Sequence, residues 1–189
     1  MEFLSELWLP ILVSAGFVWI ASAIIHMVMP WHKSEWKGLP NEEAALDAMR
    51  GAPAGNYMFP FCTMAEMKEP AFIEKQNRGP NGTVIIWPGP VNMGQNLILT
   101  LLSYIVIGVF VAYVCWHAFL GEAPEYLDRF RIAGTCAFMA HGLALIPHMI
   151  WFRGMRLWTV MLDAIIYALL TAGVFGWLWP VIVTTPPSQ

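Results

Sequence analysis

Four long apolar runs dominate the pattern of hydrophobic and polar positions along this chain. They cover about residues 7–29, 96–120, 132–152 and 157–181. Each run is long enough to cross the hydrocarbon core of a bilayer, which takes roughly 20 consecutive apolar residues. The sole formal charge inside these runs is Asp163. The pattern therefore predicts an all-α integral membrane protein with four transmembrane helices in a bundle.

The polar stretch between the first two runs divides the chain into three parts. They are transmembrane helix 1 (residues 1–30), an extramembrane cap loop (31–92), and helices 2–4 with a short C-terminal tail (93–189). In the loop, "NEEAALDAMRG" and "EPAFIEKQNRG" each predict a short helix, because they combine N-terminal Asn or Pro signals with a closing Gly. The β-branched run "TVIIW" predicts either a strand or a strip lying on the membrane. We expect this loop to cap the helix ends.

Composition and charge support lipid as the partner of this chain. Charged residues make up 12% and hydrophobic residues 58%, whereas a soluble domain carries about 25% charged residues. The net charge of −3 and the absence of a basic block argue against nucleic acid. Signature motifs of nucleotide hydrolysis, acyl transfer, zinc proteolysis and c-type haem are missing from the sequence. We therefore expect no catalytic residues.

The distribution of Lys and Arg predicts how the protein is oriented. Eight basic residues lie in the segment 31–92 and in the short link between helices 3 and 4, whereas the opposite side carries Arg129 and Arg131. Because basic loops stay in the cytoplasm, we expect the long loop inside and both termini on the non-cytoplasmic side.

A stripe of small residues runs along the fourth apolar segment. Its members recur at every fourth position: Ala164, Ala168, Ala172 and Gly176. Small residues let two membrane helices approach closely and gain dispersion contacts. The stripe is either a subunit interface or a packing face within this chain. Surfaces that could receive it are Gly108 and Ala112 of helix 2 and Ala133 and Ala137 of helix 3. The leading functional hypothesis is a non-catalytic membrane subunit that forms a homo-oligomer or joins a larger membrane complex.

Two histidines and one carboxylate are expected near the same membrane surface. His26 ends helix 1, His148 ends helix 3, and Asp163 lies about two turns into helix 4. Imidazoles with a carboxylate suit a haem b or metal site, so the alternative function is a redox or proton-handling protein. The competing hypothesis is structural: the imidazoles bind backbone carbonyls, and Asp163 reaches back to Arg156. His141, in mid-membrane, is a further relay candidate.

A second cluster of possible ligands lies in the loop segment "NYMFPFCTMAEM". It contains Met58, Cys62, Met64 and Met67, and such soft sulfur ligands suit copper. Methionines and aromatics at this density are also typical of apolar anchors against the bilayer or the helix ends. "HMVMPWH", with His26 and His32, adds slightly to the copper hypothesis. On balance we expect no cofactor, with haem b or copper as the alternatives.

Overall fold

The computed structural model describes residues 2–119 and 123–180 of the chain. It is mostly helical, and four helices are long and apolar enough to span a membrane. These are α1 (Glu2–Met27), α4 (Met93–Ala118), α5 (Tyr126–His141) with its continuation, and α7 (Leu157–Trp177). The expected span ends at Leu120 and Val181 and the expected C-terminal tail lie outside the described residues.

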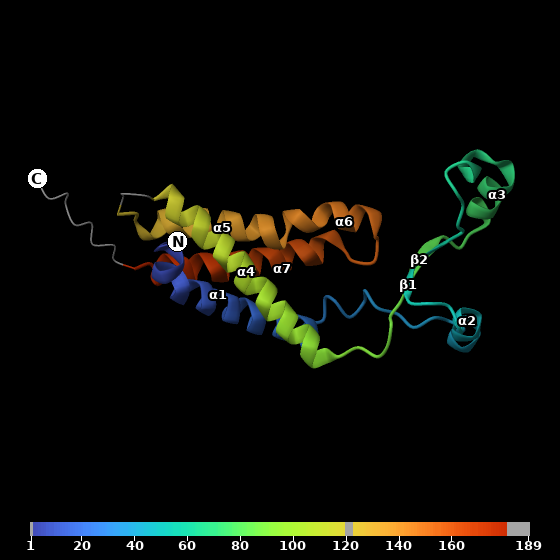
Figure 1. Cartoon of the computed structure of the whole chain (residues 1–189), viewed down its shortest axis with the longest axis horizontal. Helices are drawn as coiled ribbons and strands as arrows, with labels where there is room; N and C mark the ends of the chain where they lie inside the picture. The colour runs from blue at the N-terminus through green and yellow to red at the C-terminus, as the bar shows by residue number, and fades with distance from the viewer. Residues whose placement is uncertain (1, 120–122, 181–189) are drawn as a thin grey trace, which may run out of the picture. The chain divides into compact units, whose positions relative to one another are not determined.

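The four long helices pack alongside one another (Figure 1). α5 lies mainly against α7, and α1 lies against both α4 and α7. The largest core cluster joins all four helices through residues such as Leu7, Val111, Ala133 and Phe175, each 2% exposed or less. α5 begins with a capping box in which Glu125 and Asp128 bind each other's backbone N–H groups.

Two helices differ from the sequence prediction at their ends. The apolar run predicts a start near Leu7 with Pro10 in the first turn; α1 instead begins at Glu2, so Pro10 lies inside the helix. The third run predicts one continuous helix. α5 instead ends at His141, and the chain continues through η2 (Leu143–Leu145) into α6 (Ile146–Trp151), with Gly142 at the break. Pro147 lies just after this break, where its missing N–H costs least.

Residues Lys37–Asn92 form a separate compact unit, and the preceding residues up to Trp36 belong with the long helices. The unit contains α2 (Glu42–Met49), β1 (Gly55–Phe59), η1 (Glu66–Lys68), α3 (Pro70–Arg78) and β2 (Gly82–Ile86). The two predicted short helices are confirmed, with Pro70 opening α3 and Gly79 following it at a φ of 63° that favours glycine.

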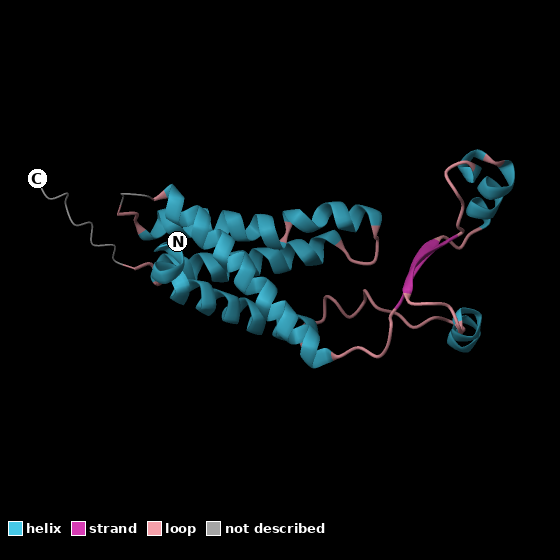
Figure 2. Ribbon diagram, in the orientation of Figure 1, coloured by secondary structure: helices cyan, strands magenta, loops and turns pink. Residues whose placement is uncertain are grey.

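The strand pair is the element that an all-α prediction leaves out. β1 and β2 form an antiparallel two-stranded ribbon (Figure 2). Of the two predictions for "TVIIW", a strand is what the structure shows. Its partner β1 comes from "NYMF", which sequence reasoning considered only as a ligand or anchor segment. Phe59 lies over Gly82 of the other strand: a Cβ atom at Gly82 would be 2.9 Å from the Phe59 ring.

Candidate metal centre

The candidate site joins the last turn of α1, the loop that follows it, and the second turn of α7. Its three members are His26, His32 and Asp163, and each offers one ligand atom within 4.8 Å of the others. His32 and Asp163 are buried, whereas His26 is exposed. All three residues belong to the same compact unit as the long helices.

The chain turns sharply after α1 and so brings His32 back to the helix end. Pro30 lies just beyond the helix, and its carbonyl accepts a hydrogen bond from the Lys33 N–H at 3.2 Å. The Glu35 N–H then donates to the His32 carbonyl at 3.0 Å. These consecutive tight turns bury the His32 side chain, which is 6% exposed.

His32 lies between two carboxylates. Its Nδ1 is 2.9 Å from Oε2 of Glu35, and its Nε2 is 2.9 Å from Oδ2 of Asp163. A carboxylate oxygen can only accept, so each ring nitrogen that donates to one carries a hydrogen. When both carboxyl groups are ionised, these two bonds together require His32 to be an imidazolium cation.

Asp163 is held by two donors from the residues that follow α1. The Trp31 indole N–H donates to Oδ1 at 3.2 Å, and His32 binds Oδ2. The Asp163 residue is 5% exposed and faces protein. This is what a carboxylate in an apolar helix requires, because an unpartnered charge near hydrocarbon is costly.

Glu35 links the same loop to the beginning of α7. Its Oε1 accepts hydrogen bonds from the Thr159 hydroxyl at 2.6 Å and from the Arg156 backbone N–H at 3.4 Å. Arg156 and Thr159 belong to the first turn of α7, where backbone N–H groups have no partner within the helix. A carboxylate at that position is also favoured by the helix dipole. Glu35 therefore caps α7 while it orients His32.

His26 lies with its ring against the ring of His32. The two ring centroids are 4.6 Å apart and the planes differ by 11°. The His26 Nδ1 is 3.0 Å from the Ser22 carbonyl oxygen, which can only accept. Nδ1 therefore carries the hydrogen, which leaves Nε2 of a neutral His26 ring with a free lone pair. A metal ligand needs such a nitrogen.

Two ionisable groups of this cluster that lie outside the long helices, His32 and Glu35, have shifted pKa values. Burial alone lowers the pKa of His32, but its hydrogen bonds to Glu35 and Asp163 and the charges of these carboxylates outweigh burial, so the pKa is raised above 6.5. Burial alone raises the pKa of Glu35, but hydrogen bonds from His32, Thr159 and the Arg156 backbone lower it below 4.5 overall. Both pKa shifts favour the charged forms of His32 and Glu35.

The structure does not place the other expected members of this cluster beside Asp163. His148 is exposed in α6, and its ring stacks on Phe152 at 4.6 Å. Arg156 contributes its backbone N–H to Glu35, and among the described residues no ion pair joins its side chain to Asp163. His141 packs edge-on against the rings of Tyr104 and Tyr167.

The role of His32 is what sequence reasoning missed. The heptapeptide "HMVMPWH" contained the signal, since Pro30 ends the helix and permits a return of the chain. The sequence alone gave no reason to pair His32 with a carboxylate more than a hundred positions away. His148 looked equally well placed because a continuous third helix brings it to the same membrane surface. In the structure the third helix is broken at Gly142, and His148 lies exposed in α6 with its ring on Phe152.

The proposed sulfur ligands lie in the Lys37–Asn92 unit. Met58 is part of β1 and 63% exposed, Met64 is 85% exposed, and Met67 in η1 is 51% exposed. Cys62 is half-buried and free. Sulfur ligands usually surround a copper ion. These exposed side chains do not form such an enclosure.

The small-residue stripe packs within this chain. A Cβ atom at Gly142 would lie 2.8 Å from Ala164 Cβ, and one at Gly134 would lie 3.1 Å from Ala172 Cβ. At the far end of the stripe, Gly176 lies against the ring of Tyr126. All four stripe residues are buried. The face of α7 that they form is therefore in close contact with α5.

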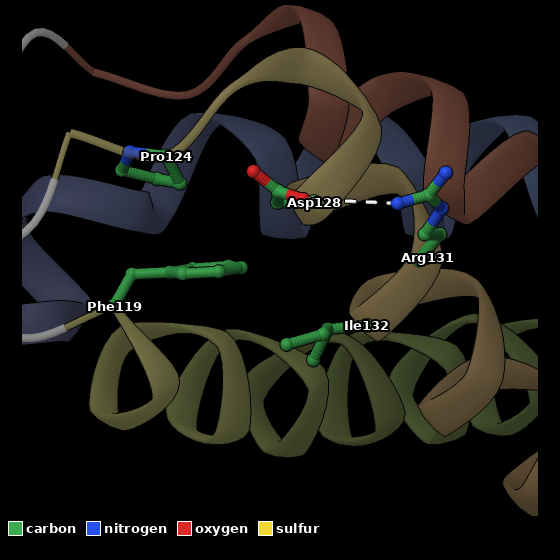
Figure 3. Close-up of a pocket in the computed structure, with 5 residues that line it drawn as sticks. All are labelled: Phe119, Pro124, Asp128, Arg131 and Ile132. Atoms are coloured by element: carbon green, nitrogen blue, oxygen red, sulfur yellow. Dashed lines mark ion pairs between the residues drawn. The ribbon is translucent and has the colours of Figure 1, made fainter.

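A shallow hollow of about 360 Å³ lies near the start of α5 (Figure 3). Phe119, Pro124 and Ile132 line it together with Asp128 and Arg131, whose side chains form an ion pair at 3.9 Å. Both charged side chains are largely solvent-exposed. Among the described residues that line this hollow, none is a buried polar group that would hold a ligand.

The ligand atoms of His26, His32 and Asp163 are of the kinds that can hold a small cation. Two imidazoles and one carboxylate are the donor set of many open zinc and non-haem iron sites. Each donor is already held by a second group: Ser22 for His26, Glu35 for His32, and Trp31 for Asp163. Comparison of the chain with protein-family models, with curated proteins and with solved structures finds no match.

Proposed function

We propose that this multi-pass membrane protein binds one divalent transition-metal ion through His26, His32 and Asp163. The observation that carries the proposal is the position of His26. Its ring lies on His32, and one of its ring nitrogens is within 4.8 Å of a buried carboxylate oxygen. Neither the His32 ion pairs nor the cap of α7 requires an imidazole at that position.

The distances are close to those that an ion needs. A tetrahedral ion that holds its ligands at about 2.0–2.2 Å places the ligand atoms roughly 3.4 Å from one another. The three donor atoms start within 4.8 Å, so small side-chain rotations are enough to close the site. Three protein ligands leave a coordination position for water or for a further group.

The surrounding hydrogen bonds support metal binding. Imidazole ligands usually donate their second ring N–H to a carbonyl or a carboxylate, which fixes the ring and raises its basicity. His26 has the Ser22 carbonyl in this role, and His32 has Glu35. Binding requires that His32 lose the hydrogen on Nε2, after which that nitrogen and Asp163 Oδ2 both face the ion.

The same geometry favours a metal ion over haem b. Two axial imidazoles approach a haem iron from opposite faces of the porphyrin. The rings of His26 and His32 lie face to face with centroids 4.6 Å apart, so no porphyrin fits between them in that role. Hard and borderline divalent cations suit this nitrogen and oxygen donor set better than Cu(I) does.

A second candidate function is the non-catalytic membrane subunit. It is supported by the four apolar helices and by the buried ion pairs of His32, which join the end of α1 to α7. In this hypothesis the cluster is structural, and His26 contributes little. The small-residue stripe does not support assembly, because it is already packed against α5. A homo-oligomer or a larger complex would need another surface.

Metal titration of the purified protein in detergent tests the proposal. After treatment with a chelator, Co²⁺ serves as the probe because its visible absorption reports tetrahedral nitrogen and oxygen ligands; Zn²⁺ is then used in competition. We expect one site per chain. His26→Ala, His32→Ala and Asp163→Asn should each weaken binding by at least about tenfold, since changing only a supporting group already costs 10–100-fold.

His117→Ala is the matched control. His117 also ends a long helix, and its Nδ1 binds a carbonyl four residues earlier, at 2.8 Å, but it lies outside the cluster. Cobalt affinity should be unchanged in this variant and in His148→Ala. Full binding in His26→Ala would contradict the metal proposal and favour the structural hypothesis. A thermal melt in chelator checks that each variant is folded.

A further inference from the structure

The strand ribbon of the Lys37–Asn92 unit is free of charge. Here the ribbon means residues 51–65 and 79–92, which include β1 and β2. Every charged side chain of the unit lies outside it, in residues 37–50 and 66–78 around α2, η1 and α3. The unit is therefore divided into two charged helical segments and an uncharged, apolar strand pair.

The ribbon has no core of its own. None of the side chains from Lys37 to Asn92, all of which the structure describes, is buried. An isolated two-stranded hairpin is at best marginally stable in water and needs a hydrophobic face covered by something else. The apolar side chains of the ribbon therefore require a partner.

The two faces of the ribbon differ in what covers them. On one face, the rings of Tyr57 and Phe59 lie over the glycines Gly55 and Gly82. The other face carries Met58 opposite Thr83 and Ile85 opposite Asn56, so these apolar side chains have no large neighbour across the strands.

Exposure follows the same division. Met58 and Ile85 are 63% and 62% exposed, whereas Tyr57 is 37% exposed. Trp87, which is 59% exposed, is the first residue after β2 and lies two positions from Ile85, the spacing at which side chains of an extended chain share a side. Met58, Ile85 and Trp87 are named here the open face.

The connection between the ribbon and α4 is short. β2 ends at Ile86, and α4, which is apolar enough to span a membrane, begins at Met93. Seven residue steps reach at most about 25 Å when fully extended. Whatever the path of this connection, the end of the ribbon stays within that distance of the start of α4.

We propose that the open face of the ribbon binds the headgroup region of the lipid bilayer. Trp side chains are enriched at that depth, because their rings are apolar and their N–H groups reach water. The ribbon cannot enter the hydrocarbon, since its outer strand edges carry unpaired backbone groups that need water or headgroups. An uncharged ribbon has no desolvation cost from ionised side chains.

Lipid is favoured over a second copy of the chain by connectivity. In each copy the ribbon is joined to α4 by a connection of seven residue steps, so lipid contact needs no partner protein and no particular protein concentration. Lipid contact should also be independent of salt, because the ribbon carries no charge. The proposal is independent of the metal centre, which lies in the other compact unit.

Fluorescence quenching in phosphatidylcholine vesicles tests the proposal with the full chain. The background is Cys62→Ser with Cys136→Ser, in which the remaining Cys115 is fully buried. An environment-sensitive dye is attached at Ile85→Cys on the open face. The matched control is Lys75→Cys, which is exposed on α3 among charged neighbours.

We expect lipids with a nitroxide near the headgroup to quench the dye at Ile85→Cys, and aqueous iodide to quench it about threefold less than the dye at Lys75→Cys. These ratios should not change when salt is raised. Equal iodide quenching at both positions would overturn the proposal. A second outcome would also overturn it: protection of the dye at Ile85→Cys from iodide that is lost when more lipid is added per protein chain. That result would indicate a second copy of the chain as the partner.

Discussion

At the residue scale, the side chain of Asp163 joins two segments, the loop after α1 and the helix α7. It accepts hydrogen bonds from Trp31 and His32, both of which follow α1, while its own backbone belongs to α7. Replacing it leaves donors behind in a buried site. The loss of stability therefore depends on whether the new side chain can still accept hydrogen bonds from Trp31 and His32.

Asp163→Leu should destabilise the protein by about 1–3 kcal/mol or more, because the Trp31 N–H and the His32 ring lose their acceptor while they stay buried. Asp163→Asn should cost less, since the amide oxygen can still accept one of the two hydrogen bonds. Chemical unfolding in detergent with chelator present measures both values. If both variants lost the same stability, the hydrogen bonds would not explain the role of Asp163.

The charged pair of His32 and Glu35 predicts how the metal-free protein responds to pH. The pKa of His32 is raised above 6.5, so its contribution to stability is fully present below pH 6.5 and is lost as pH rises through the folded-state value. The pKa of Glu35 is lowered below 4.5, so its contribution is present above pH 4.5 and is lost as pH falls through the folded-state value.

Both contributions overlap between pH 4.5 and 6.5. We expect the midpoint of thermal unfolding of the chelator-treated protein to be highest in this range. In His32→Gln, the unfolding midpoint should fall less steeply as the pH rises above 6.5. A wild-type melting profile that rises steadily from pH 6 to pH 9 would contradict the imidazolium assignment.

At the element scale, the contact between α5 and α7 depends on glycines and alanines. Small residues let the two helices approach so closely that added atoms have no room. Gly142 lies where a Cβ atom would meet Ala164 at 2.8 Å, whereas a Cβ atom at Gly173, on α7 itself, meets nothing within 4 Å. The two positions form a matched pair.

Gly142→Ala should destabilise the protein by about 1–3 kcal/mol through overpacking. Gly173→Ala should be neutral or stabilising by up to about 1 kcal/mol, because alanine is the better helix former. Unfolding of both variants in the same detergent tests the difference. A reversed order would mean that α5 and α7 can separate without loss of stability.

At the scale of the whole molecule, the orientation in the membrane stays a prediction. It rests on the excess of Lys and Arg in residues 31–92 and in the link before α7. Ser5→Cys and Ser34→Cys, each in a Cys62→Ser background, should report opposite sides. With an impermeant thiol reagent added to intact cells, we expect labelling at Ser5→Cys and protection at Ser34→Cys; the reverse pattern would invert the topology.

Much of the fold follows from local pattern. The four long helices were predictable because each crossing of the hydrocarbon core requires about 20 apolar residues, and each segment meets this requirement by itself. The short helices α2 and α3 were predictable from their end signals, Asn41, Pro70 and Gly79. The strand β1 was not, because a strand is defined by its partner, and β2 begins more than twenty residues later.

The sequence alone determined the class of the protein, its apolar helices and two of the three candidate ligands, His26 and Asp163. Only the tertiary structure decided that His32 joins them in place of His148, and that the small stripe of α7 faces α5. The reason is the range of the interactions. Hydrophobic length and helix ends are properties of neighbouring residues, whereas a ligand set depends on the direction in which each turn aims a side chain. After the turn at Pro30 the ring of His32 lies on His26, whereas the ring of His148 lies on Phe152, and neither contact can be calculated from residue spacing.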